Sequence, residues 1–307
     1  MKSSTFTFKN SDNMDVFVYK WEPSGKPKAV VQIAHGMAEH AARYERFAKA
    51  LTSAGFAVYA NDHRGHGKTA GTLDKAGICG PEDGFFRAID DMRTLNLMIK
   101  KDHPKTAIFL FGHSMGSFLS QNYIARYGAE LNGCILSGTA GDGGALIKVG
   151  NVIAKIVSLI YGRNTPSPTL DKMSFGAFNS AFKPNRTAFD WLSRDNAEVD
   201  KYINDPWCGF LCTAGFFYDM TKGLMDTHSK TRMAAIPKTL PIFSVAGAND
   251  PVGANGVSVM QLIDAYKKLD IKDVNVKLYK DTRHEILNEI NRDEVTKDII
   301  DWLKKHL

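Results

Sequence analysis

A serine between two glycines lies where a strand-like run meets a helix-like run. Residues 112–116 are Gly-His-Ser-Met-Gly; the β-branched and aromatic run Ala107–Phe111 precedes them, and the helix-forming stretch Ser117–Tyr127 follows. A sharp strand-to-helix turn lifts the serine hydroxyl clear of its neighbours and accepts only glycine two residues to either side. An ordinary turn serine is the alternative, which the flanking elements disfavour. The pattern therefore predicts that Ser114 is a nucleophile.

This chemistry needs two partners, because a serine hydroxyl is a weak nucleophile until a histidine takes its proton and a carboxylate orients that histidine. For a strand-turn-helix nucleophile, the acid and then the histidine follow along the chain. Asp250 follows the strand-like run Leu240–Ala246. Beyond it lie only His284 and His306, and His306 is the penultimate residue of an amphipathic helix. His284, which follows the run Val274–Lys280, is therefore the predicted base.

All three candidates follow strands, which places them at the carboxyl edge of a parallel sheet. Acyl transfer also needs N–H donors for the oxyanion, and one is the amide after the nucleophile, that of Met115. The other comes from a turn after an earlier strand, and Ala29–Ala34 followed by His35-Gly36-Met37 supplies one. We expect the Met37 amide to be that donor, each donor contributing about 2.7–4 kcal/mol. An Asx turn at Asp250 and a plain strand-ending turn at Gly36 are the alternatives.

Composition and charge exclude several classes of protein. The chain has 307 residues and a formal net charge of +6, with acidic and basic residues interspersed, so no nucleic-acid partner is expected. No uninterrupted apolar run of about eighteen residues occurs, which predicts no membrane span. Gly65–Thr69 resembles part of a phosphate-binding loop, but Asp62 stands where that loop needs glycine. No secretory leader is evident, so the expected location is the cytoplasm.

The cysteines indicate neither disulfides nor a metal site. They form no CxxC pair and lack histidines at ligand spacing, so we interpret them as packing residues. Cys208 and Cys212 could share one helix face. The four positions are Cys79, Cys134, Cys208 and Cys212.

Strand-like and helix-like segments alternate over most of the chain. Two strands at the start, Thr5–Lys9 and Val16–Trp21, are separated by turn residues and predict a hairpin. Six further strands alternate with helices, among them helices near 43–53 and 85–101. The pattern predicts an α/β fold with an eight-stranded, mostly parallel sheet flanked by helices. The further strands are Ala29–Ala34, Phe56–Ala60, Ala107–Phe111, Gly133–Leu136, Leu240–Ala246 and Val274–Lys280.

The alternation stops for about one hundred residues after Gly138, and this segment reads as helical with breaks rich in proline and asparagine. We interpret residues 138–237 as a helical cap inserted over the active site, between core parts 1–137 and 238–307. Apolar cap residues would suit an acyl chain, although such stripes are also common in plain cores. They are Phe210, Leu211, Phe216, Phe217, Met220, Leu224 and Met225.

One cap segment, Ala145–Tyr161, has a wide apolar face that needs a partner. Its polar residues share one helical stripe, namely Lys148, Asn151, Lys155 and Ser158. The catalytic domain, another subunit or a lipid surface could cover the apolar face. Packing within the protein is the favoured interpretation. Peripheral contact with a membrane or micelle stays open, as does the oligomeric state.

Several segments together resemble a known family. They are His35–His40, Asp62–Gly67, Gly112–Ser117, Asp190–Asp195 and Arg283–Glu289. In combination they resemble the bacterial form of the monoacylglycerol lipase and lysophospholipase-like branch of the α/β-hydrolases, which also includes serine aminopeptidase-type domains. The resemblance covers nearly the whole chain. It implies the α/β-hydrolase fold with a cap, and a two-step acyl-enzyme reaction on an ester or lipid that requires no metal or organic cofactor.

The resemblance also suggests substrate contacts. It places Glu39 and Arg43 near the pocket for the leaving group, and Phe217 belongs to the apolar cap surface. The third residue after the base is polar in eukaryotic monoacylglycerol lipases, whereas here it is Leu287. This departure bears on the recognition of glycerol.

Three alternatives to a monoacylglycerol lipase or lysophospholipase remain. A general short-chain carboxylesterase would have a shallow pocket. An aminopeptidase-like enzyme would need an acidic group to hold an α-ammonium, for which Glu39 is the nearby candidate. A non-catalytic binding protein on the same fold usually lacks a member of the triad, whereas all three are present here.

Overall fold

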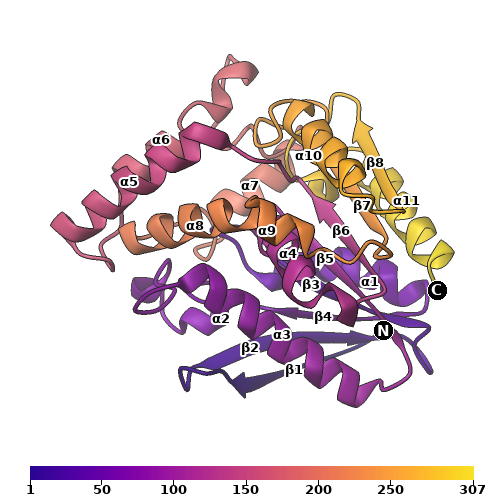
Figure 1. The fold of residues 1–307 in the computed structure, drawn as a ribbon. Coiled ribbons are helices and arrows are strands. Elements are labelled where there is room, and N and C mark those ends of the chain that lie inside the picture. The colour runs from indigo at the N-terminus through magenta and orange to yellow at the C-terminus, as the bar shows by residue number, and fades with distance from the viewer.

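Eight strands form one sheet, and helices cover both of its faces (Figure 1). The computed structural model describes residues 1–307. The strands follow the order β1-β2-β4-β3-β5-β6-β7-β8; β2 pairs antiparallel with β1 and β4, and the other pairs are parallel. Their bounds are β1 (Lys2–Lys9), β2 (Asp15–Glu22), β3 (Ala29–Ala34), β4 (Phe56–Asn61), β5 (Ala107–His113), β6 (Gly133–Ser137), β7 (Ile242–Gly247) and β8 (Val274–Tyr279).

Eleven α-helices and five short 3-10 helices connect and cover these strands. The α-helices are α1 (Glu45–Ser53), α2 (Gly67–Ala70), α3 (Gly84–Asp102), α4 (Met115–Tyr127), α5 (Gly144–Tyr161), α6 (Pro168–Phe175), α7 (Asn196–Asn204), α8 (Ala214–Thr227), α9 (Lys230–Ala234), α10 (Val257–Lys268) and α11 (Arg292–Lys305). The 3-10 helices are η1 (Ala41–Tyr44), η2 (Leu73–Lys75), η3 (Gly128–Glu130), η4 (Phe178–Phe182) and η5 (Ile286–Asn288).

Strand periodicity explains why both faces of the sheet are covered. Successive side chains of a strand point to opposite faces. Val30 of β3 therefore packs in one cluster with apolar residues of α3, α4 and α10, whereas Val31 packs in a second cluster with residues of α1 and α11. Both valines are fully buried. A parallel sheet with two apolar faces needs such a helix layer on each side.

The predicted fold class is confirmed, with eight strands close to their expected positions. The predicted hairpin joins β1 and β2, where the Asn10 side chain accepts the N–H groups of Asp12 and Met14 and closes the turn.

Between β6 and β7 the chain forms helices α5 to α9 and no named strand, and we call residues 138–237 the cap segment. Its parts differ in position. Helices α5 and α6 lie at the outer edge of the molecule, away from the sheet (Figure 1). Helix α8 contacts α3, α4 and α5, and α9 contacts α4. The cap segment is therefore anchored on the core through its last helices.

The orientation of α5 overturns the favoured interpretation of its apolar face. Part of its polar stripe faces inward: Asn151 donates to the Tyr218 carbonyl and the Thr221 hydroxyl on α8, and Ser158 is buried, whereas Lys148 and Lys155 are exposed. Most of its large apolar side chains face outward, with Leu146 82% and Leu159 75% exposed, while Ile153 and Val157 pack against the core. Two hydrogen bonds and small side chains set this orientation, which amphipathicity alone could not predict.

Helix α5 is also long and apolar enough to cross a membrane, by length and composition alone. The prediction of no such segment needs this correction. Lys148 and Lys155 interrupt the apolar run, so a search for uninterrupted stretches passes over it.

Candidate active site

Ser114 lies at the turn between β5 and α4 in a conformation that few residues adopt. Its φ is +52° and its ψ is −119°. The flanking glycines are required by close packing, because a Cβ at Gly112 would lie 2.3 Å from the Gly116 carbonyl oxygen and one at Gly116 would lie 2.1 Å from the Ala34 carbonyl oxygen. Strained backbone of this kind concentrates at functional sites. The turn holds the serine side chain at the wall of a cavity.

His284 and Asp250 are joined by a buried hydrogen bond, with Nδ1 of the imidazole 2.9 Å from Oδ2 of the carboxylate. The imidazole is 2% exposed and the carboxylate residue 0%. Asp250 is fixed in turn by the Val252 amide, which donates to its Oδ1 over 2.9 Å. Ser114 and His284 line the same cavity. The structure thus brings together the three residues that the sequence predicted as a triad.

The surroundings of His284 favour its protonated form more than its burial suggests. Burial lowers the pKa of His284, but the charge and hydrogen bond of Asp250 outweigh burial and leave the pKa raised above 6.5. The ring of His113 lies 4.8 Å from that of His284, and burial lowers the pKa of His113 to about 4, so His113 is neutral at pH 7. The two neighbouring imidazoles are therefore shifted in opposite directions, and only the pKa of His284 is raised.

The loop after β3 and the start of α4 border the serine together. Met37 and Met115 line an apolar cavity that also includes Ser114. The Met37 amide makes no hydrogen bond within the protein, and Met115 is the first residue of α4, so its amide has no acceptor within its own helix. Both amides are free to donate.

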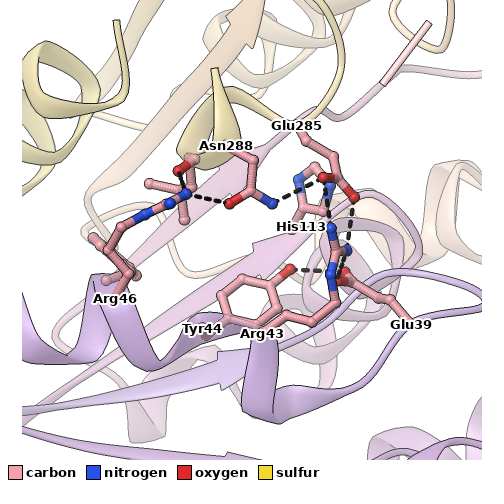
Figure 2. A pocket seen from close by; sticks show the side chains of 9 residues that line it. Glu39, Arg43, Tyr44, Arg46, His113, Glu285 and Asn288 are labelled. Atoms are coloured by element: carbon pink, nitrogen blue, oxygen red, sulfur yellow. Dashed lines mark hydrogen bonds and ion pairs between the residues drawn. The ribbon is translucent and has the colours of Figure 1, made fainter. Parts of the chain in front are cut away.

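A buried ionic network links the loop after β3 to the loop that carries His284 (Figure 2). Arg43 donates to both oxygens of Glu285 over 2.7 and 2.8 Å and to Glu39 over 2.5 Å. Glu39 also accepts from the Gly36 amide and the Tyr44 hydroxyl. Burial would raise the pKa of Glu285, but Arg43 overrides it and lowers the pKa to about 2. Glu285 is therefore charged, and both carboxylates are already paired with Arg43.

Two cavities meet at Ser114. One of about 440 Å³ is lined mostly by apolar side chains of α4, α5, α6 and α8, and includes Phe217. The other, of about 400 Å³, has a mixed lining that includes Glu39, Asp171, Lys172 and Tyr202. Both contain Met37. A substrate with an apolar part and a polar part can therefore place its reacting carbonyl beside Ser114.

A family model described as serine aminopeptidase, S33, matches residues 25–291. The chain belongs to this family. A monoacylglycerol lipase of Mycolicibacterium smegmatis is 31% identical, covering 94% of this chain and 92% of that protein. The monoglyceride lipase of Homo sapiens is 28% identical over 94% of this chain and 86% of that protein. A highly thermostable carboxyl esterase from Bacillus coagulans, solved in complex with glycerol, has a TM-score of 0.91 at 29% identity, covering 99% of both chains.

These comparisons confirm the predicted resemblance to the α/β-hydrolases. The S33-family protein described here is a serine ester hydrolase. Since the solved carboxyl esterase aligns over 99% of both chains, the cap segment as well as the core has a counterpart in that structure.

The predicted substrate residues line three different spaces: the apolar cavity, the mixed cavity and a small adjoining pocket. Phe217 lines the apolar cavity and Glu39 the mixed one, whereas Arg43 and Leu287 line a small adjoining pocket. Among the other apolar cap residues, Met220 and Leu224 also line the apolar cavity. Met225 and Leu211 are partly solvent-exposed.

Sequence reasoning missed residues that surround the triad. Glu285 could have been recognised from the sequence, because it directly follows the predicted base and a carboxylate at that position indicates a cation nearby. The ring of Trp191 lies 5.0 Å from the His284 ring at an angle of 36°, and Tyr202 lines the mixed cavity. Both come from the cap segment; Trp191 lies in the family-like segment Asp190–Asp195 but was given no role, and no pattern indicated Tyr202.

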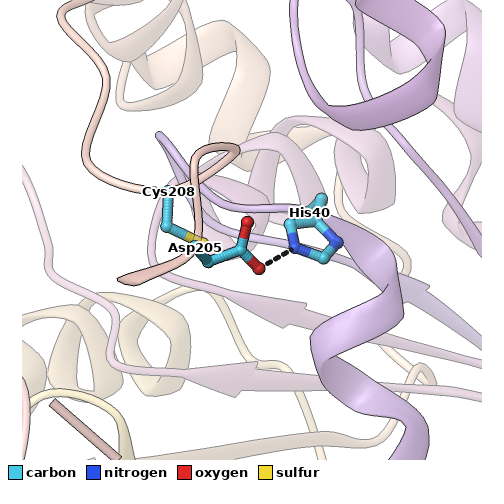
Figure 3. A group of neighbouring side chains, drawn as sticks. All are labelled: His40, Asp205 and Cys208. Atoms are coloured by element: carbon cyan, nitrogen blue, oxygen red, sulfur yellow. Dashed lines mark hydrogen bonds and ion pairs between the residues drawn. The ribbon is translucent and has the colours of Figure 1, made fainter. Parts of the chain in front are cut away.

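One cluster offers donors of the kinds that zinc binds. His40, Asp205 and Cys208 have ligand atoms within 4.8 Å of one another (Figure 3). However, His40 Nε2 already bonds directly to Asp205 over 2.8 Å, and three donors are one fewer than a structural zinc site uses. Cys208 and Cys212 precede α8 in a loop, so they do not share a helix face, which their spacing would have allowed. The His40–Asp205 contact joins the loop after β3 to the cap segment.

Proposed function

We propose that this S33-family hydrolase cleaves esters of one medium or long acyl chain with a small polar alcohol, monoacylglycerols foremost and lysophospholipids next. The observation that carries the proposal is the pair of unlike cavities that meet at Ser114. The similarity to monoacylglycerol lipases at 28–31% identity supports the same substrate class.

The apolar cavity would hold the acyl chain. Its walls include Phe118, Phe217 and Met220, and methionine and aromatic side chains adapt to a flexible chain. Each buried methylene contributes up to roughly 0.8 kcal/mol, which corresponds to about fourfold in binding. Activity should therefore rise with acyl length until the cavity is filled.

The mixed cavity would hold the alcohol. Asp171 and Lys172 lie side by side in its lining, and the aromatic rings of Trp191 and Phe175 form another part of the wall. Neutral hydroxyl groups can bond to such a lining without leaving a buried charge unpaired. A choline or ethanolamine head group could instead lie on the aromatic rings.

The reaction would follow the acyl-enzyme route. Ser114 attacks the ester carbonyl, His284 takes its proton and returns it to the leaving alcohol, and Asp250 holds the imidazole through Nδ1. The amides of Met37 and Met115 would stabilise the oxyanion. Water, activated by the same histidine, then releases the fatty acid.

Helix α5 would bring the enzyme to its substrate. Leu146 and Val149 belong both to the exposed face of α5 and to the lining of the apolar cavity. An amphipathic helix with exposed leucine and isoleucine binds the interface of a membrane or micelle. The cavity mouth would then face the lipid from which the acyl chain enters.

An aminopeptidase function remains the second candidate, and the charges near the site count against it. An α-ammonium needs a free carboxylate, whereas Glu39 and Glu285 are both paired with Arg43. Asp171 is the remaining acidic group of the mixed cavity, and burial raises its pKa.

The test is a substrate panel run with the wild-type enzyme and the Ser114→Ala variant. Octanoyl, lauroyl and oleoyl monoacylglycerols, lysophosphatidylcholine, a butyryl aryl ester and aminoacyl arylamides cover the alternatives. Serine-dependent preference for the longer monoacylglycerols supports the proposal. Preference for the butyryl ester would make the protein a short-chain carboxylesterase, and serine-dependent cleavage of arylamides would make it a peptidase. Activity retained in Ser114→Ala would overturn the mechanism.

A further inference from the structure

We infer that the cap segment holds the loop after β3, here named the oxyanion loop (residues 35–40), in its active conformation. Tyr202 is the positioning residue, and it acts through the Ala38 carbonyl. The inference rests on the oxyanion role proposed for the adjacent Met37 amide. It assigns to the cap segment a part in the chemical step, in addition to binding the substrate.

The first observation is backbone strain next to the Met37 amide. Ala38 has a φ of +51°, in the left-handed region that glycine adopts freely and alanine does not. Ala38 is buried and lines the mixed cavity. A residue persists in this region only where its surroundings enforce it.

The second observation is the set of hydrogen bonds that enforces the strain. The Ala38 carbonyl accepts from the Tyr202 hydroxyl and from the Gly209 amide, both over 2.9 Å, and both donors belong to the cap segment. The Ala38 amide donates to Nε2 of His66 over 3.2 Å. Burial lowers the pKa of His66 to about 4, so this nitrogen stays an acceptor at pH 7. The core therefore binds the amide of Ala38, and the cap segment binds its carbonyl.

Further contacts keep Tyr202 and the cap segment in place. The guanidinium of Arg43 lies 4.9 Å from the centre of the Tyr202 ring, and the ring of Phe189 lies 5.1 Å from it. Nearby, His40 of the oxyanion loop bonds to Asp205 of the cap segment over 2.8 Å. The ring of Tyr202 is thus held by contacts with the core and with the cap segment before any substrate binds.

The consequence concerns the direction of the Met37 N–H. Rotation of Ala38 out of the left-handed region would turn the peptide plane that follows Met37 and loosen the loop that presents its amide. Loss of an oxyanion donor costs about 10²–10³ in kcat. Misplacement of the donor should cost less, so we expect an effect of about tenfold.

The experiment combines Tyr202→Phe with Ala38→Gly in the full-length enzyme, assayed on a soluble butyryl ester. Tyr202→Phe keeps the ring and removes the hydroxyl, and it should lower kcat about tenfold with KM changed less than about twofold. Adding Ala38→Gly should restore most of kcat, because glycine adopts the required φ without enforcement. Tyr266→Phe, at a buried tyrosine whose hydroxyl lies near Gln121, is the matched control and should keep wild-type kcat.

The outcomes separate positioning from substrate contact and from simple loss of structure. Unchanged kcat in Tyr202→Phe overturns the inference. A rise in KM that Ala38→Gly does not reverse would mean that the hydroxyl binds substrate, and this also overturns it. Ala38→Gly alone tests the strain without altering Tyr202: relief of strain should offset the entropy that glycine adds to the unfolded chain, so the melting temperature should match or exceed that of the wild type, and a drop would show that the strain is smaller than this entropy cost. Failure of the proposed function is distinguishable, because it would appear in the wild-type enzyme itself as a preference for the butyryl ester or the arylamides over the longer monoacylglycerols.

Discussion

Two parts of the cap segment differ in how they contact the rest of the molecule: an inner end, residues 191–202, and an outer end, helix α5. At the inner end, the amides of His284 and Glu285 donate to the carbonyls of Trp191 and Leu192 over 3.4 and 2.7 Å, and Tyr202 donates to Ala38. At the outer end, α5 rests on α8 and exposes most of its apolar side chains. The inner end is bonded to both loops that would perform the chemistry, whereas the outer end is free to meet another surface.

This difference implies a division of labour within one insertion. Segments with many buried hydrogen bonds open only at a free-energy cost near that of global unfolding, whereas segments with few buried contacts move more easily. The inner end should therefore stay with the core during turnover. Substitutions at the inner end should change catalysis and stability, and those at the outer end should change access to lipid.

The largest expected effect is on the chemistry that the inner end surrounds. Asp250→Asn should lower kcat by roughly 10⁴, because the imidazole loses the partner that fixes its tautomer. Activity requires neutral His284, so kcat/KM of the wild type should fall as the pH drops below its raised pKa. Without the charge of Asp250 that pKa falls, and the acid limb should move to lower pH.

A pH–rate profile of kcat/KM on the butyryl ester measures both effects. The control is Asp200→Asn, at an exposed carboxylate of the cap segment that pairs with Arg186. It should match the wild type. An acid limb that stays in place in Asp250→Asn would mean that another group titrates, and His284 would no longer be the base.

The next largest effect concerns the ionic network of Arg43, Glu39 and Glu285, which joins the two inner loops: the loop after β3 and the loop that carries His284. Arg43→Ala leaves Glu39 and Glu285 buried without their cation, which should cost about 3–5 kcal/mol in the free energy of unfolding. In the wild type, Glu285 has a pKa of about 2 against an ordinary 4.5. The charged form therefore stabilises the fold above about pH 4.5, and that stabilisation is lost as the pH falls toward 2.

Urea unfolding of the wild type and Arg43→Ala between pH 7 and pH 3 checks this prediction, since the variant should lose the dependence that Glu285 causes. Arg186→Ala removes an exposed ion pair and should change stability by less than about 1 kcal/mol. Equal stability of Arg43→Ala and the wild type at pH 7 would show that the network does not hold the inner loops.

The core was predictable because its signals are local. The strand before Ser114 and the helix after it are both visible in the sequence, and the order of Asp250 and His284 follows from the motif. Their hydrogen bond agrees with that prediction, while their catalytic roles stay proposals. Burial on both sheet faces gives continuous apolar strands that are easy to recognise.

The cap segment was not predictable to the same depth, because its contacts are long-range. Tyr202 and Ala38 lie far apart in the sequence, and no periodicity indicates that their groups meet. Helix α5 shows the same limit. A wide apolar face says that a partner is needed, but the hydrogen bonds of Asn151 decided which face turned inward.

The smallest expected effect tests the outer end. Leu159 and Ile160 are exposed and lie outside both cavities, so Leu159→Ser with Ile160→Ser should change the free energy of unfolding by about 0.5 kcal/mol or less and leave butyryl ester hydrolysis intact. Hydrolysis of oleoylglycerol in phosphatidylcholine vesicles should fall roughly tenfold, because an inserted aliphatic side chain contributes up to about 1.5–3 kcal/mol and here it enters only in part. Leu97→Ser, at an exposed leucine of α3, is the matched control and should match the wild type on vesicles. Equal vesicle activity in all variants would remove the membrane role from α5. The outer end would then differ from the inner end in its exposure and its few hydrogen bonds, and not in a contact with lipid.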